Sequence, residues 1–103
     1  MLTFEKVLEM FRDYLERDME LEVCRSRYGY VCVSFSGTST EPVFCEGELC
    51  RTPEELFDHL LTEYESFALI QLTRGRREET EADREQVRHL CQRYLDRREE
   101  EVK

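Results

Sequence analysis

Five cysteines are the residues of this chain with the widest chemistry, and two of them bracket the segment CRSRYGYVC at positions 24 to 32. Cysteine thiolates bind zinc, act as nucleophiles and form disulfides. Structural zinc sites use closely spaced cysteine pairs, whereas Cys24 and Cys32 are eight positions apart, and Cys45 and Cys50 are five apart. The spacing therefore disfavours a metal centre, and we expect neither a metal ion nor another cofactor.

Thiol catalysis is the second chemistry that these residues could perform. Cys50 lies two residues before the expected start of a helix, where the helix dipole lowers the pKa of a thiol. His59 is a candidate base, but it lies nearly two turns inside that helix and should point away from its start. His89 has the spacing of a solvated surface histidine. We therefore expect no enzymatic activity, and we keep a thiol-dependent enzyme or redox sensor that uses exposed cysteines as the alternative.

The residues around CRSRYGYVC alternate as they do in a β-hairpin. Apolar residues recur at every second position, first Met19, Leu21 and Val23 and then Val31, Val33 and Phe35. Both sets should face the same side of the sheet. A three-residue loop over 27–29 satisfies this condition because it pairs Val23 with Val33. It also places Cys24 opposite Cys32 on the side away from the helices, as reduced neighbours that folding does not require.

A third strand is expected from about 43 to 49, after the turn-rich segment GTSTEP. The preferred register pairs Phe35 with Val43 and buries Cys45. A shifted register would bury Phe44 instead, but it would turn an acid inward. The sheet surface away from the helices should then show Glu20, Glu22, Cys24, Tyr30, Cys32, Ser34 and, in the preferred register, Phe44.

Three helices account for most of the remaining chain. The first covers about 4–17, where apolar residues recur at helical spacing after the capping residue Thr3. The second begins at Thr52, with Pro53 at its first position and Glu55 completing a capping box.

The second helix is expected to include the segment FALIQL at 67–72, for which a short strand is the alternative, and to end at Gly75. The third helix begins at Thr80, with Asp83 in its first turn. The tail from about residue 97 has little to bury, so we expect it to fray.

The order of these elements, α-β-β-β-α-α, predicts one α+β domain over residues 1–103, in which helices cover one face of a three-stranded antiparallel meander. The helix-three-strand-helix order resembles the topology of double-stranded-RNA-binding domains. Those domains present lysines at the start of their last helix, whereas TPEEL places Glu54 and Glu55 there. Direct nucleic-acid binding is therefore not expected.

The charge of the chain favours basic partners. The formal net charge is −9, and residues 41–66 hold eight acids against one base. Such a surface repels phosphate backbones. The N-terminal segment carries charges every few residues, so it lacks the apolar stretch of a signal peptide or membrane span. We expect a cytoplasmic protein with reduced cysteines and no membrane attachment.

Together these features predict a small acidic, non-enzymatic binding protein that regulates or inhibits a partner protein. We expect it to occupy a surface of the partner, such as a basic one that otherwise holds nucleic acid. Small acidic inhibitors encoded by phages and other mobile elements, including anti-CRISPR proteins, act in this way. The candidate partner-binding residues are Glu54, Asp58 and Glu65 on one helix face, together with Tyr30 and Phe44 on the sheet.

The segment FALIQL also suggests self-association. It is apolar on more sides than one neighbouring helix can cover, which is typical of an interface. A homodimer through Leu69, Ile70 and Leu72 is one solution. Packing of these residues against the third helix of the same chain is the other, and the sequence leaves both open.

Overall fold

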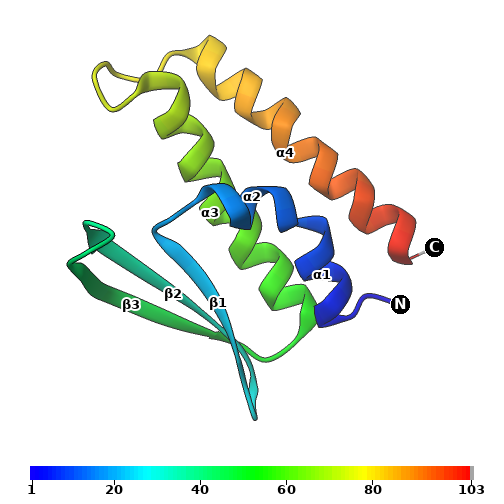
Figure 1. Ribbon diagram of the computed structural model, residues 1–103. Coiled ribbons are helices and arrows are strands. Elements are labelled where there is room, and N and C mark those ends of the chain that lie inside the picture. Colours follow the sequence, from blue (N-terminus) through cyan, green and yellow to red (C-terminus); the bar gives the residue numbers. More distant parts are fainter. Residues whose placement is uncertain (103) are drawn as a thin grey trace.

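A computed structural model describes residues 1–102 of the chain. It contains one antiparallel sheet with strand order β1-β2-β3, and helices that precede and follow it. The helices gather on one side of the sheet (Figure 1). The predicted α+β fold and its order, α-β-β-β-α-α, are confirmed. The elements are α1 (Phe4–Met10), α2 (Arg12–Arg17), β1 (Leu21–Ser26), β2 (Gly29–Gly37), β3 (Pro42–Cys50), α3 (Pro53–Thr73) and α4 (Glu81–Val102).

Side-chain caps explain where the helices begin. The Thr3 hydroxyl accepts a hydrogen bond from a first-turn amide of α1 at 3.1 Å, and Thr52 accepts one from the Glu55 amide at 3.1 Å. Before α4, the Thr80 amide donates to the Asp83 carboxylate at 2.8 Å, and the Asp83 amide donates back to the Thr80 hydroxyl at 3.2 Å. These bonds satisfy amides that lack a partner inside the helix. All three predicted starts are confirmed.

The helix bodies follow the prediction with one interruption. The helix expected over about 4–17 is divided at Phe11 into α1 and α2. The segment 67–72 lies within α3 and is helical, so the strand alternative is wrong. The helix ends where Arg74 and Gly75 adopt left-handed backbone angles, with φ values of 56° and 66°.

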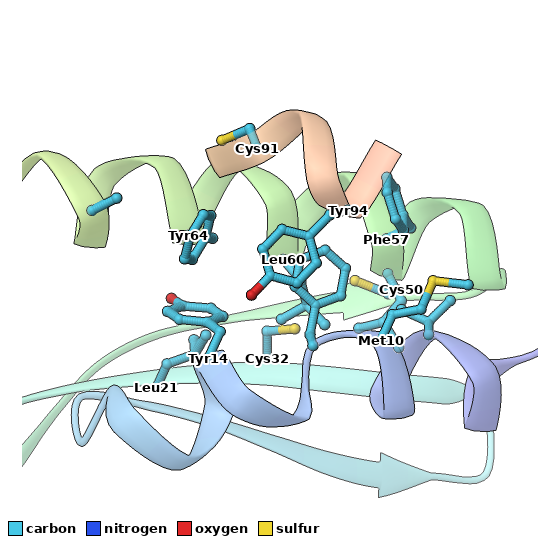
Figure 2. Close-up of a cluster of buried hydrophobic side chains, with 14 of the residues drawn as sticks. Met10, Tyr14, Leu21, Cys32, Cys50, Phe57, Leu60, Tyr64, Cys91 and Tyr94 are labelled. Carbon is cyan, nitrogen blue, oxygen red and sulfur yellow. The ribbon is translucent and has the colours of Figure 1, made fainter. Parts of the chain in front are cut away.

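Helical side chains fill most of the core. Phe11 stacks on Tyr94 with ring centroids 4.3 Å apart, which joins the start of α2 to α4. Figure 2 shows Tyr14, Tyr64 and Tyr94 converging between α2, α3 and α4. The sheet therefore contributes only a small share of the core. The largest fully buried side chains are Tyr14, Phe11, Phe57, Leu56, Leu60, Val7 and Cys50, and Cys50 is the one strand residue among them.

The C-terminal end of α4 lies against α1. The Arg97 guanidinium donates a hydrogen bond to the Met10 carbonyl at 2.7 Å, and the Lys6 ammonium pairs with the Glu101 carboxylate at 2.9 Å. The expectation that the chain frays from about residue 97 is wrong, because α4 continues to Val102. Polar and charged contacts, which apolar periodicity does not reveal, hold this end in place.

The register between β1 and β2 also differs from the prediction. Ser26 pairs with Gly29, so the loop has two residues instead of three and Cys24 faces Val31. A shift of one residue turns every side chain of a strand to the opposite face. Cys32 therefore points into the core, where it is 2% exposed, while Cys24 points away. The predicted pairing of Cys24 with Cys32 is wrong.

The prediction failed because it assigned the larger apolar set of β2 to the helix side. Helical side chains already fill the space between the helices and the sheet. At the centre of β2, only the small thiol of Cys32 points into this space (Figure 2). Tyr30, Cys32 and Ser34 consequently face the helices rather than solvent, contrary to expectation.

The register of β3 contains a bulge. Ser34 pairs with Glu46 and Phe35 pairs with Phe44, which leaves Cys45 as an extra residue in β3. Cys45 is exposed. Both the expected pairing of Phe35 and the expected burial of Cys45 are wrong, because a bulge interrupts the alternation on which they were based.

Candidate functional site

The side of the sheet away from the helices carries a row of apolar side chains. Cys32 lies in the core, so the residues next to it in β2 must face the opposite way. Phe44 and Leu49 of β3 continue the row beside them. Within residues 1–102, no helix lies on this side (Figure 1). We name this surface the open face, and its apolar residues are Val31, Val33, Phe35, Phe44 and Leu49.

Two aromatic rings lie next to each other on the open face. The rings of Phe35 and Phe44 meet edge to face with centroids 6.2 Å apart. A Cβ at Gly47 would lie 3.9 Å from the Phe44 ring and 3.5 Å from a methyl group of Val31. The Phe44 ring thus extends toward the backbone where Gly47 offers no side chain. Phe44 is nevertheless 62% exposed, and the other four apolar residues of the open face are half-buried, so part of each remains open to contact.

A hollow borders the open face at the β2–β3 turn. Its volume is about 380 Å³, and Phe35 forms part of its wall. Glu20 and Glu22 line the same hollow, and no basic residue among 1–102 does. Met19, which is 81% exposed, adds a flexible apolar side chain. The hollow therefore combines apolar walls with negative charge.

Within residues 1–102, the acids of the sheet region have no charged partner. Residues 18–50 hold six acids against two bases. Among residues 1–102, no ion pair involves this segment, whereas arginines of α4 pair with acids of the same helix, as Arg84 does with Glu81 at 2.6 Å. The negative charge of the sheet is thus available to an external cation.

The candidate acids of α3 are less available than the sequence suggested. Asp58 lies 3.5 Å from the guanidinium of Arg98 on α4. Glu65 lines a groove of about 310 Å³ between α3 and α4, together with Arg84 and Arg88. Glu54 is exposed at the start of α3. The structure therefore does not gather the three acids into one free acidic surface.

The two aromatic candidates lie on opposite faces of the sheet. Phe44 belongs to the open face, as described above. Tyr30 faces the helices, where its ring centroid lies 4.8 Å from that of Phe4 in α1. The register found for β2 accounts for this separation, and it removes Tyr30 from the surface where we placed it.

Burial makes most of the thiols poor nucleophiles. All five cysteines are free, and Cys24 and Cys45 are exposed. Burial raises the pKa of Cys32 from 9.0 to about 12, and it raises that of Cys91 to about 11. The pKa of Cys50 is also raised by burial, although its hydrogen bond with Cys32 acts in the opposite direction.

A catalytic pairing of Cys50 with His59, which the sequence disfavoured, finds no support in this geometry either. Cys50 is 2% exposed, so it lies inside the core rather than at an accessible helix start. His59 approaches Glu63 at 3.7 Å, one turn further along α3. Among residues 1–102, no group of three or more histidine, cysteine or acidic side chains is placed to hold a metal ion.

The candidate self-association residues are partly covered within the chain. Leu69 and Leu72 are half-buried and pack against the core that α3 and α4 share. Ile70 remains 59% exposed. Packing within the chain therefore covers two of the three residues in part, and the homodimer stays a prediction.

Sequence reasoning missed four residues of the open face: Val31, Val33, Phe35 and Leu49. It assigned the β2 residues to the core because large apolar side chains usually face the helices. One available signal was the number of large apolar residues in the three helices, which suffices to fill a core without them.

Within the described residues, no helix is both long enough and apolar enough to cross a bilayer. Comparisons with protein-family models, curated proteins and solved structures gave no significant match for this chain.

Proposed function

We propose that this chain is a small acidic binding protein without enzymatic activity, which regulates or inhibits a partner protein by occupying a basic part of its surface. Inhibitors encoded by phages and other mobile elements, including anti-CRISPR proteins, act in this way. The site of action is the cytoplasm, where free thiols such as those of this chain persist.

The unpaired acids of the sheet carry this proposal. An acid without an intramolecular partner gives up only hydrating water when it meets an external cation, whereas a paired acid must also give up its partner. Glu22, Glu46 and Glu48 belong to strands, and no arginine or lysine within residues 1–102 pairs with them. Glu22 lies on the open face, whereas Glu46 and Glu48, which pair with Ser34 and Cys32, lie on the other face of the edge strand β3. Their field attracts basic surfaces and repels phosphate groups.

The alternative function, a thiol-dependent enzyme or redox sensor, has less support. A reactive cysteine needs an accessible thiol with a lowered pKa. The pKa values of Cys32, Cys50 and Cys91 are all raised instead. Cys24 and Cys45 are exposed, and no histidine within residues 1–102 belongs to their strands.

The test is capture of partner proteins from the source cell on the immobilised chain at roughly 0.05 M and 0.5 M salt. A variant with Glu22→Gln, Glu46→Gln and Glu48→Gln should retain much less partner than the native chain. A matched control with Glu9→Gln, Glu81→Gln and Glu85→Gln removes the same charge from acids that already have partners. It should retain nearly as much partner as the native chain.

A third variant, with Glu54→Gln, Asp58→Asn and Glu65→Gln, tests the acids of α3. Loss of the partner in this variant alone would move the binding surface to α3. The proposed function itself would be wrong if the captured partner bound equally well at both salt concentrations, or if no protein were retained at low salt.

A further inference from the structure

We propose that the open face is the docking surface of this protein, and that it takes a protein segment whose apolar centre is flanked by arginine or lysine side chains. This inference rests on the proposed function and adds to it the place of binding and the chemistry of the bound segment.

The apolar side chains of the sheet divide into those that pack in the core and those that do not. Leu21, Val23 and Tyr30 of the sheet pack against the helices, and they belong to or contact the core. The five apolar residues of the open face are absent from that core. Large apolar side chains gathered on one exposed surface favour contact with another apolar surface, because burial removes them from water.

The charge of the surrounding residues selects the partner. The hollow beside Phe35 is lined by Glu20 and Glu22 and, in the described part of the chain, by no basic residue. Its volume of about 380 Å³ accommodates the aliphatic stem of an arginine or lysine against Phe35 and Met19. The cationic head would then meet the two carboxylates, in a charge-assisted contact. The same residues would repel a nucleic acid or another anionic surface.

A second copy of this chain fits the open face poorly. Two open faces in contact would bring their copies of Glu20 and Glu22 together, and each chain has a formal net charge of −9. Like charges held close together oppose association. The charge therefore favours a basic partner over self-association through this surface.

The free edge of β3 is a less suitable place for binding than the open face. Edge pairing needs a regular row of backbone donors and acceptors. Pro42 lacks an amide donor at one end of β3, and the bulge at Cys45 interrupts the row. The partner segment is thus expected to lie across the side chains of the open face and not to extend the sheet at β3.

The experiment measures the affinity of a labelled synthetic peptide with an apolar centre and arginines at both ends. One matched peptide has glutamates in place of the arginines, and another has serines in place of the apolar centre. The arginine-flanked apolar peptide should bind most tightly. Phe44→Ser should weaken its binding about tenfold, which is typical of a central contact residue.

Matched variants control for general effects. Ile70→Ser removes a residue that is 59% exposed on α3 and should change affinity less than about twofold. Glu22→Gln leaves the apolar residues intact, so it tests the surface even if Phe44→Ser folds poorly. It should weaken binding severalfold, whereas Glu16→Gln on α2 should not.

The outcomes separate the two proposals. If the arginine-flanked peptide binds with strong salt dependence but Phe44→Ser and Glu22→Gln have no effect, the docking surface is wrong and the proposed function stands. If the peptide without arginines binds equally well, the open face stands and the basic partner is wrong. If light scattering shows a dimer that Phe44→Ser dissociates, the face binds a second copy and the inference is overturned.

Discussion

Cys24 and Cys32 have the same chemistry and lie on neighbouring strands, but their surroundings differ. Cys32 contributes to the core, and burial raises the pKa of its thiol to about 12. Cys24 is exposed on the other side of the sheet. The difference arises from the pairing of β1 with β2 and not from either residue, so it can be tested by identical substitutions at the two positions.

Cys32→Ser should lower the free energy of unfolding by about 1–3 kcal/mol, because it buries a hydroxyl in place of a thiol that packs as an apolar group. Cys24→Ser should change it by less than about 0.5 kcal/mol. Urea denaturation of the two variants measures both values. Equal effects at the two positions would mean that the strands pair as the sequence suggested, with both cysteines on the same face.

Thiol labelling gives a second prediction at this scale. In the folded protein at neutral pH, Cys24 and Cys45 should react with a thiol reagent, because they are exposed. Cys32, Cys50 and Cys91 should react only after denaturation, since their raised pKa values keep them protonated and the core shields them. Rapid labelling of Cys50 in the folded state would instead support the thiol-dependent alternative.

At the scale of the elements, local signals in the sequence were sufficient for the helices but not for the sheet. Thr52, Pro53 and Glu55 act within one helical turn, so the sequence alone identified the start of α3. Strand register depends instead on what lies beneath the sheet and on the exact loop length. The apolar pattern of β2 suggested burial of Val33, yet the helices had already filled that side.

This failure bears on the candidate site. Local rules of sequence and structure are most often broken at functional positions. The residues that broke the rule here, among them Val31, Val33 and Phe35, are those of the open face. The side of the sheet on which these residues lie could be obtained only from the pairing of β1 with β2 and of β2 with β3. The acidity of the sheet region, in contrast, was visible in the sequence.

The close approach of the start of β2 to the end of β3 can be tested through Gly29. Its φ is 142°, and a Cβ at this position would lie 2.2 Å from the carbonyl oxygen of Cys50. Gly29→Ala should therefore lower the free energy of unfolding by more than about 2 kcal/mol. Gly75 also has a positive φ, of 66°, but no atom lies within 4 Å of a Cβ there.

Gly75→Ala is thus the matched control, and it should cost about 1–2 kcal/mol, the usual penalty for a left-handed backbone. Thermal denaturation followed by circular dichroism compares the two variants. A Gly29→Ala protein as stable as the Gly75→Ala protein would argue against close contact between the start of β2 and the end of β3.

At the scale of the whole molecule, the N-terminal residue lies against the last turns of α4. The N-terminal ammonium group of Met1 donates a hydrogen bond to the Glu101 carbonyl at 3.1 Å, and Arg97 bonds to α1. The last turns of α4 are thus held against α1 and the N-terminal residue. The helices form a framework that leaves the open face of the sheet to solvent.

Arg97→Ala should lower the free energy of unfolding by about 1–2 kcal/mol, because it removes a charged hydrogen bond to the Met10 carbonyl. Arg88→Ala is the control, since the ion pair of Arg88 with Glu85 stays within α4 and is exposed. Hydrogen exchange should also show amides at 97–101 protected in the native chain. Exchange at those amides as fast as in an unfolded peptide would restore the expectation of a frayed tail.

The measurement that tests the central claim most directly is a map of amide chemical-shift changes as the arginine-flanked apolar peptide is added to the isotopically labelled chain. The largest changes should fall on β2 and β3 around Val33, Phe44 and Leu49 and on β1 near Glu22, while the amides of α3 and α4 change little. Changes concentrated on α3 between Glu54 and Glu65, or spread evenly over the acids of the chain, would contradict the assignment of the open face as the binding surface.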